Sequence, residues 1–245
     1  MTKTKEQLRE DIKIARSKNF FNRIEKFYRK LPETECSGCG KCCYDTPVVY
    51  YIEFMYVFEL FDTYEESTKI NVLDAALSAF LYGLIDKTHK CAFLDDNNRC
   101  MIYSRSPISC KRWGLHSKEE NENDWNNDFE HNKKIKDFYK KEGIEISDEV
   151  INWRLPYCNN VIITNNPYRI NESDFTEYIH DLVKVERKYI DGKVKEWTII
   201  EYLIYCLMGI EMYNKRIELV KKYQNGEADV IENFIKEQDI KSLIS

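Results

Sequence analysis

The sequence predicts a mainly α-helical protein with a small β hairpin, in which a cysteine-rich core is joined to a helical C-terminal half. Three observations predict this class. Among 245 residues there are eight glycines and five prolines, against 17 tyrosines and 12 phenylalanines, which favours helices with aromatic cores over a turn-rich all-β fold. Apolar residues recur at helical spacing along much of the chain. Eight of the nine cysteines lie between Cys36 and Cys158.

The N-terminal third alternates helical and loop signals. Residues 5–30 have the apolar spacing of one amphipathic helix, and Pro32 ends it. Residues 36–43 form a tight loop, because Gly38 and Gly40 permit turns that larger residues resist. A short β-like run at 48–52 precedes a predicted helix at 53–61.

The middle of the chain predicts the hairpin. After a predicted helix at 70–87, two β-like segments at 91–94 and 100–103 flank the turn-forming residues 95–98. Pro107 then suits the first turn of a short helix that runs through Cys110.

Residues 117–145 are strongly polar, and we expect a surface insertion or an exposed helix there. Apolar residues at helical spacing resume after residue 173. The apolar stretch 197–213 contains Glu201 and Glu211, so it predicts a buried core helix rather than a membrane span. The predicted C-terminal helices are 173–190, 196–223 and 227–243. The expected divisions are a cysteine-cluster region with an N-terminal helix (1–116), the polar segment (117–145) and a helical C-terminal region (146–245) that completes the same fold.

Composition excludes several classes of partner. The net charge of −5 gives no general attraction to nucleic acid or to an anionic membrane. The N-terminus has no apolar run, so a signal peptide is not expected and the predicted location is cytoplasmic. In that compartment thiols stay reduced, which makes a metal-ligand role a better explanation of the cysteines than a disulfide framework.

The densest motif is the octapeptide CSGCGKCC at residues 36–43. Thiolates spaced by two residues can converge on one metal or cluster, because a short loop brings their sulfurs to one side. Neighbouring thiols seldom face the same centre. The predicted ligands in this loop are Cys36, Cys39, Cys42 and Cys43.

The second group of cysteines is Cys91, Cys100 and Cys110, and Cys158 lies in a later loop. If the hairpin forms, Cys91 and Cys100 open its two strands. We expect the first loop and this second group to close on a shared centre, with Cys158 as a further ligand. A [4Fe–4S] cluster needs four thiolates, and zinc held by four thiolates is the close alternative. Whether the cysteines form one centre or two is open.

These residues resemble a known family. CSGCGKCC, followed by CAFL at 91–94 and CMIYSRSPISCK at 100–111, is similar to the bacterial CxxCxxCC cysteine-cluster family, also called YkgJ-like proteins. The resemblance covers about residues 36–112 and implies zinc or iron binding, without implying an activity.

Two positions depart from the family pattern, which has an arginine before the proline and another after the last cysteine. Here Ser106 precedes the proline, with Arg105 one place earlier, and Lys111 and Arg112 follow Cys110. We expect Arg105, Lys111 and Arg112 to offset the charge of a cluster or to bind an anion.

One branch of the family is similar to flagellin lysine N-methylases, which use S-adenosylmethionine and carry an iron–sulfur cluster. This resemblance adds two alternatives to a plain metal-binding protein: a methyltransferase acting on a protein substrate, and a structural zinc module. The sequence does not decide whether the chain is an enzyme. His89 and His116 are near the cysteines and are expected to be surface or supporting residues, since no two histidines share a ligand spacing.

Overall fold

The computed structural model describes residues 3–115, 117–164, 172–187 and 197–244, except for some side chains within this range, among them that of Cys36. The described chain is mainly helical, with two small antiparallel sheets of two strands each, so the predicted class is confirmed. The longer helices are α1 (Lys5–Ser17), α2 (Phe20–Tyr28), α3 (Tyr51–Phe61), α4 (Glu66–Tyr82), α6 (Lys118–Lys141), α8 (Glu172–Glu186), α9 (Ile199–Met208) and α10 (Met212–Gln224). The short ones are α5 (Ile108–Lys111), α7 (Asp148–Ile151), α11 (Val230–Lys236), α12 (Ile240–Ile244) and the 3₁₀ turns η1 (Lys41–Tyr44) and η2 (Tyr103–Arg105).

The single helix predicted at 5–30 is two helices. Thr4 caps α1, since its side chain accepts the N–H of Gln7 while the Gln7 side chain accepts the N–H of Thr4. The break comes at Asn19, which adopts a left-handed conformation with φ 57°. Asparagine tolerates that conformation better than most residues. The prediction erred because Asn19 is a much weaker helix-breaking signal than glycine or proline.

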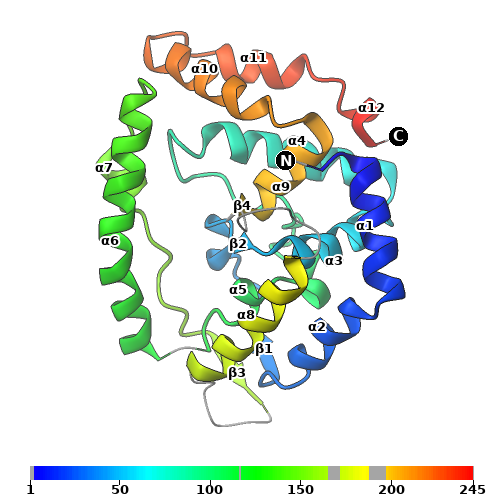
Figure 1. The fold of residues 1–245 in the computed structure, drawn as a ribbon. Coiled ribbons are helices and arrows are strands. Elements are labelled where there is room, and N and C mark those ends of the chain that lie inside the picture. The colour runs from blue at the N-terminus through cyan, green and yellow to red at the C-terminus, as the bar shows by residue number, and fades with distance from the viewer. Residues whose placement is uncertain (1–2, 116, 165–171, 188–196, 245) are drawn as a thin grey trace.

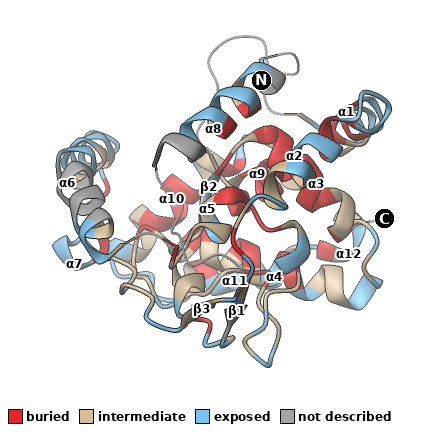
Figure 2. Ribbon diagram, turned by 90° about the horizontal axis from the view of Figure 1, so that it is seen from below, coloured by how far each residue is buried: buried red, intermediate tan, exposed pale blue. Residues whose placement is uncertain are grey.

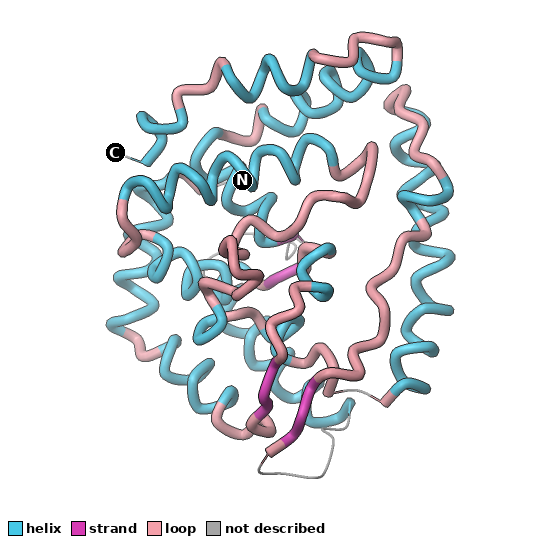
Figure 3. Tube along the Cα trace, turned by 180° about the vertical axis from the view of Figure 1, so that it is seen from behind, coloured by secondary structure: helices cyan, strands magenta, loops and turns pink. Residues whose placement is uncertain are grey.

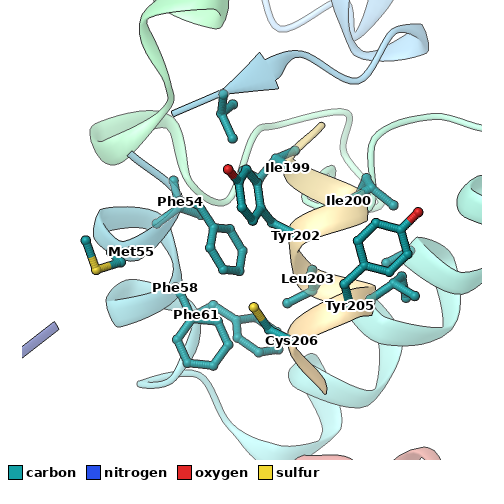
Figure 4. Packing of buried hydrophobic residues seen from close by; sticks show 14 of the residues in the cluster. Phe54, Met55, Phe58, Phe61, Ile199, Ile200, Tyr202, Leu203, Tyr205 and Cys206 are labelled. Atoms are coloured by element: carbon teal, nitrogen blue, oxygen red, sulfur yellow. The ribbon is translucent and has the colours of Figure 1, made fainter. Parts of the chain in front are cut away.

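The main hydrophobic core lies where α3, α4 and α9 pack together (Figure 4). Nearly every residue of α3 and α9 is buried, and the rings of Phe54 and Tyr202 stack with centroids 5.1 Å apart. The stretch 197–213 is therefore a core helix, as predicted, but Gly209 (φ 94°) ends it and α10 begins separately. Within the described residues, no helix is long and apolar enough to cross a bilayer.

The sheets join segments that are distant in sequence. Strand β1 (Thr34–Cys36) pairs with β3 (Val161–Ile163), and β2 (Val48–Val49) pairs with β4 (Trp197–Thr198). The predicted hairpin at 91–103 is reduced to a tight turn with one bridge, between Leu94 and Cys100. Its two halves are too short to form a ladder, so the strands lie elsewhere.

The polar segment predicted as an insertion or exposed helix contains α6, which stands along one side of the molecule (Figures 1 and 2). Its C-terminal end is attached through α7 by a second small core. That core consists of Leu84, Ile144, Ile146, Val150, Ile217 and Val220. The helix predicted at 173–190 is found as α8, and residues 188–190 of that prediction lie outside the described chain.

The helices surround a central zone of loops and short strands, which is seen clearly from behind (Figure 3). Three cysteine-bearing segments, η1, the turn at 91–100 and α5, belong to this zone. The sequence-distant cysteines are thus carried by segments that a helical frame holds near the middle of the molecule.

Candidate metal centre

The first cysteine loop turns back on itself at Gly38 and Gly40, whose φ angles are 65° and 66°. The 3₁₀ turn η1 follows and carries Cys42 and Cys43, whose sulfurs lie 3.9 Å apart. A Cβ atom at Gly40 would lie 3.3 Å from the side chains of Leu94 and Asn98. Glycine at this position therefore lets the first loop pack closely against the turn that carries the second group of cysteines.

The second segment is attached to the first by its backbone. The N–H of Cys91 donates to the carbonyl oxygen of Cys43 at 2.6 Å. The Asp95 carboxylate accepts the N–H groups of Asn97 and Arg99, which fixes the turn between Cys91 and Cys100. The Asp95 carboxylate therefore stabilises the backbone of this turn, as its turn chemistry predicts.

The third segment is α5, which carries Cys110. The N–H of Ile108, the first residue of α5, donates to the buried carboxylate of Glu53 at 2.8 Å. The Ser109 hydroxyl donates to the carbonyl oxygen of Val48. The Cys110 helix is thereby tied to both α3 and β2, and the short helix predicted after Pro107 is confirmed.

Thiols from the three segments affect one another electrostatically. The pKa of Cys91 is raised to about 12, mainly by burial and also by the neighbouring Cys100 and Cys42 thiols. Burial also raises the pKa of Cys110, with added contributions from Cys91, Cys100 and Cys42. The pKa of Cys42 is raised chiefly by its contact with the Cys43 thiol. Each thiolate in this group disfavours ionisation of the others. A bound cation would offset this repulsion and allow several of the thiols to be deprotonated at the same time.

Cys110 combines two properties that are usually separate. Its side chain is exposed to solvent, yet desolvation is the largest cause of its raised pKa. Cys110 is therefore accessible to solvent, while nearby protein atoms and thiols disfavour its thiolate form.

Cys39 differs from the thiols at the centre. It is exposed, and its pKa is lowered, first by the backbone N–H of Lys41 and then by the side chains of Ser37 and Asn160. Hydrogen bonds to the sulfur favour the thiolate. Its surroundings therefore favour the thiolate form of Cys39, which is the form that binds metals.

Cys158 lies beside the first sheet. A Cβ atom at Gly114, where φ is 84°, would come within 3.4 Å of the Cys158 Cβ and 2.7 Å of Val161 Cγ2. In that sheet Val161 is the backbone partner of Cys36. Cys158 is thus near the start of the cysteine loop. Gly114, whose importance the sequence analysis missed, leaves the room for this approach.

The donor chemistry fits a thiophilic metal, since thiols from three segments share one neighbourhood. In the side chains that the structure describes, no three His, Cys, Asp or Glu residues are arranged to hold a single metal ion. The complete ligand set, including Cys36, stays a prediction.

The three basic residues predicted near the cysteines have different surroundings. Arg105 donates to the Glu59 carboxylate at 2.6 Å and to the Tyr56 carbonyl oxygen at 3.1 Å. Lys111 donates to the Tyr103 carbonyl oxygen at 3.2 Å, and burial lowers its pKa while the Cys110 and Cys100 thiols oppose that shift. Arg112 ends α5.

Of the three, Lys111 is the one whose charge interacts with the thiols. A role for Arg105 or Arg112 in binding an anion stays a prediction. His116 lies outside the described residues, whereas His89 is described and partly buried.

The sequence analysis missed Glu53. This carboxylate is 1% exposed and accepts hydrogen bonds from the Ile108 N–H, the Tyr28 hydroxyl and, more weakly at 3.4 Å, the Tyr50 N–H. Burial raises its pKa to about 7, against the opposing effect of those donors. A lone acidic residue inside the apolar run YIEFMYVF was the signal that could have identified it.

Comparison with known proteins gives one match. The model of the CxxCxxCC family, described as "putative zinc- or iron-chelating domain", matches residues 35–159, which is just over half of the chain and includes Cys158. No curated protein and no solved structure matches the chain.

Proposed function

The chain belongs to the CxxCxxCC family of zinc- or iron-chelating cysteine-cluster domains, and we propose that its cysteines hold an iron–sulfur cluster. The ligands would come from the cysteine loop, the turn at 91–100 and α5. One observation carries the proposal: four thiols from these three segments affect one another electrostatically within the helical frame. They are Cys42, Cys91, Cys100 and Cys110.

The number and spread of the thiols support a cluster over a single zinc ion. A zinc ion draws four thiolate sulfurs to about 2.3 Å from one point. A [4Fe–4S] cluster places its own iron and sulfide atoms between its four thiolates, so those thiolates stand further apart. Among the described side chains, no three His, Cys, Asp or Glu residues are placed to hold one metal ion. That arrangement suits the larger group.

The surroundings support a negatively charged centre. A cluster with four thiolates carries net negative charge, and the partly buried ammonium of Lys111 interacts with Cys110 and Cys100. When bound, the cluster would supply electron transfer, or respond to oxidants, or hold the three loop segments together. The protein's own contribution is the frame that brings those segments to one place.

The proposal is tested by purification without oxygen, followed by analysis of iron, sulfide and zinc and by absorption and EPR spectra. We expect iron and acid-labile sulfide in equal amounts, with visible absorption that Cys91→Ala and Cys100→Ala each remove for the most part. Cys206→Ala is the matched control, because Cys206 is buried in α9 within the apolar core.

Stoichiometric zinc without iron or sulfide would overturn the proposal of an iron–sulfur cluster. The cysteines would then form a zinc site, which the family description also includes. A chain without either metal, or equal metal content in all three variants, would overturn the metal centre itself.

A further inference from the structure

A cleft of about 330 Å³ opens beside Cys91. Among the residues that line it are His89 and Cys91, together with Asp95 and Asp96 of the neighbouring turn. We refer to it as the Cys91 cleft. The cleft opens beside one cysteine of the proposed centre, and a histidine and two aspartates are among its lining residues.

His89 is held in a defined orientation within this cleft. Its Nδ1 lies 3.3 Å from the Asp86 carboxylate, which in turn accepts the backbone N–H and the hydroxyl of Thr88. The ring of Tyr82 stacks on the imidazole, with centroids 4.9 Å apart and planes 8° apart. Three contacts from one short segment therefore fix both the plane and the rotation of the ring.

The contact with Asp86 decides which nitrogen of His89 is available. A carboxylate accepts hydrogen bonds, so this contact favours the tautomer with the proton on Nδ1, which makes Nε2 the nitrogen suited to bind a cation. A histidine whose other nitrogen donates to a carboxylate is the usual arrangement of a metal-binding imidazole in proteins. His89 and Cys91 are both among the residues that line this cleft.

The charges in the cleft suit a cation. Asp95 and Asp96 are both on its lining, and Lys90 is the cationic side chain among its lining residues. The Lys90 ammonium is already engaged, since it donates to Asn98 Oδ1 at 2.8 Å and lies 5.4 Å from the centroid of the Tyr44 ring. Two carboxylates and one engaged ammonium leave the cleft with a net negative charge.

We infer that the Cys91 cleft is the entry site for a thiophilic divalent cation, Fe²⁺ or Zn²⁺, and that His89 Nε2 is its first protein ligand. The ion then passes to Cys91, whose N–H is bonded to Cys43 and whose thiol interacts with Cys42 and Cys100. His89 is a transient ligand, and the completed centre is bound by thiolates. This inference rests on the proposed metal centre and adds the route by which it is filled.

The test uses the full chain, stripped of metal without oxygen, and Co²⁺ as the probe. Bands from thiolate-to-cobalt charge transfer report filling of the centre, and stopped-flow mixing gives the rate. We expect His89→Gln to slow uptake about tenfold or more while the final spectrum and stoichiometry stay as in the wild type. Asp86→Ala should slow it several-fold, because it removes the acceptor that faces Nδ1 and favours Nε2 as the metal-binding nitrogen.

The control is His180→Gln, since His180 is an exposed histidine on α8, away from the cleft lining. Circular dichroism confirms that each variant keeps its helix content. Uptake by His89→Gln within twofold of His180→Gln would overturn the entry site while leaving the metal centre intact. A loss of bound Co²⁺ in His89→Gln would make it a permanent ligand and overturn the transient role. If the wild-type chain shows no thiolate-to-cobalt charge-transfer bands after Co²⁺ is added, both the inference and the metal centre are overturned.

Discussion

The helical core and the cysteine-bearing zone are built on opposite principles. The core of α3, α4 and α9 is held by apolar side chains that are almost completely buried, such as Phe54 and Leu203. The cysteine zone has short strands, turns and thiols that are partly exposed. The first region is stable through burial alone. The second has its segments in place but needs a cation to hold its thiolates together.

The largest effect expected from one substitution falls on the core. Phe54→Ala should lower the free energy of unfolding by about 3–5 kcal/mol, because a fully buried ring between Phe58 and Tyr202 is removed and leaves a cavity. Chemical denaturation of metal-loaded and metal-stripped protein should give the same loss in both. If the loss of unfolding free energy differs between metal-loaded and metal-stripped protein, the two regions are not stabilised independently.

The next effect concerns Glu53, which links the regions. Its pKa is about 7 in the folded chain, above the ordinary value of 4.5, so the folded state binds this proton more tightly than the unfolded state. The stability from this group is complete below about pH 4.5 and is lost as pH rises through 7, by about 3 kcal/mol in all.

Glu53→Gln should remove that loss. The measurement is the difference in unfolding free energy between variant and wild type from pH 5 to pH 8, in metal-free protein. If the difference in unfolding free energy between the variant and the wild type does not change with pH, the raised pKa of Glu53 is contradicted, however large that difference is.

A smaller effect is expected at the edge of the cysteine zone. Gly114→Ala should cost about 1–3 kcal/mol, since φ is 84° and the added Cβ would meet Val161 at 2.7 Å. It should also disturb Cys158 and so lower metal retention more than its effect on helix content would suggest. Metal content and circular dichroism measured on one preparation check this, and Gly226→Ala is the matched control, because its φ is also positive but no atom lies within 4 Å.

The smallest effect is expected from Arg105→Ala, which tests whether Arg105 belongs to the helical core or to the metal centre. Arg105→Ala should cost about 1–2 kcal/mol, through loss of its partly buried ion pair with Glu59 and its contact with the Tyr56 ring. If Arg105 is mainly structural, as its contacts indicate, metal content should be unchanged. Metal loss from Arg105→Ala with unchanged stability would instead support the charge-offsetting role predicted from the sequence.

The same contrast explains what could be predicted from the sequence. The helices of the core follow from apolar spacing and few glycines, and α3 was predicted close to its observed bounds. The single helix predicted at 196–223 is instead divided into α9 and α10 at Gly209. Strand β2 lies within the β-like run predicted at 48–52. The strand pairings were not predicted, because β1 and β2 pair with segments more than a hundred residues away, and local patterns carry no information about such partners. The break at Asn19 depends on one backbone conformation without a strong sequence signal.

For the site, spacing and residue type identified the cysteines, since ligand loops are local. The room that Gly114 leaves for Cys158 and the hydrogen bonds of Glu53 to three segments depend on tertiary packing. The orientation of His89 lies between these two cases. Asp86 and Tyr82 are close to it in sequence, but their contacts with His89 require the chain to turn back at the end of α4.

The pairing of β1 with β3 also has a consequence for the order of synthesis. The strand that contains Cys36 obtains its partner only after Val161 to Ile163 have been made and have left the ribosome. Helices α1 to α4 are complete long before then. Until then the nascent chain carries a thiol-bearing strand that lacks its partner, and the cysteine loop can reach its final form only after residues 161–163 have been made.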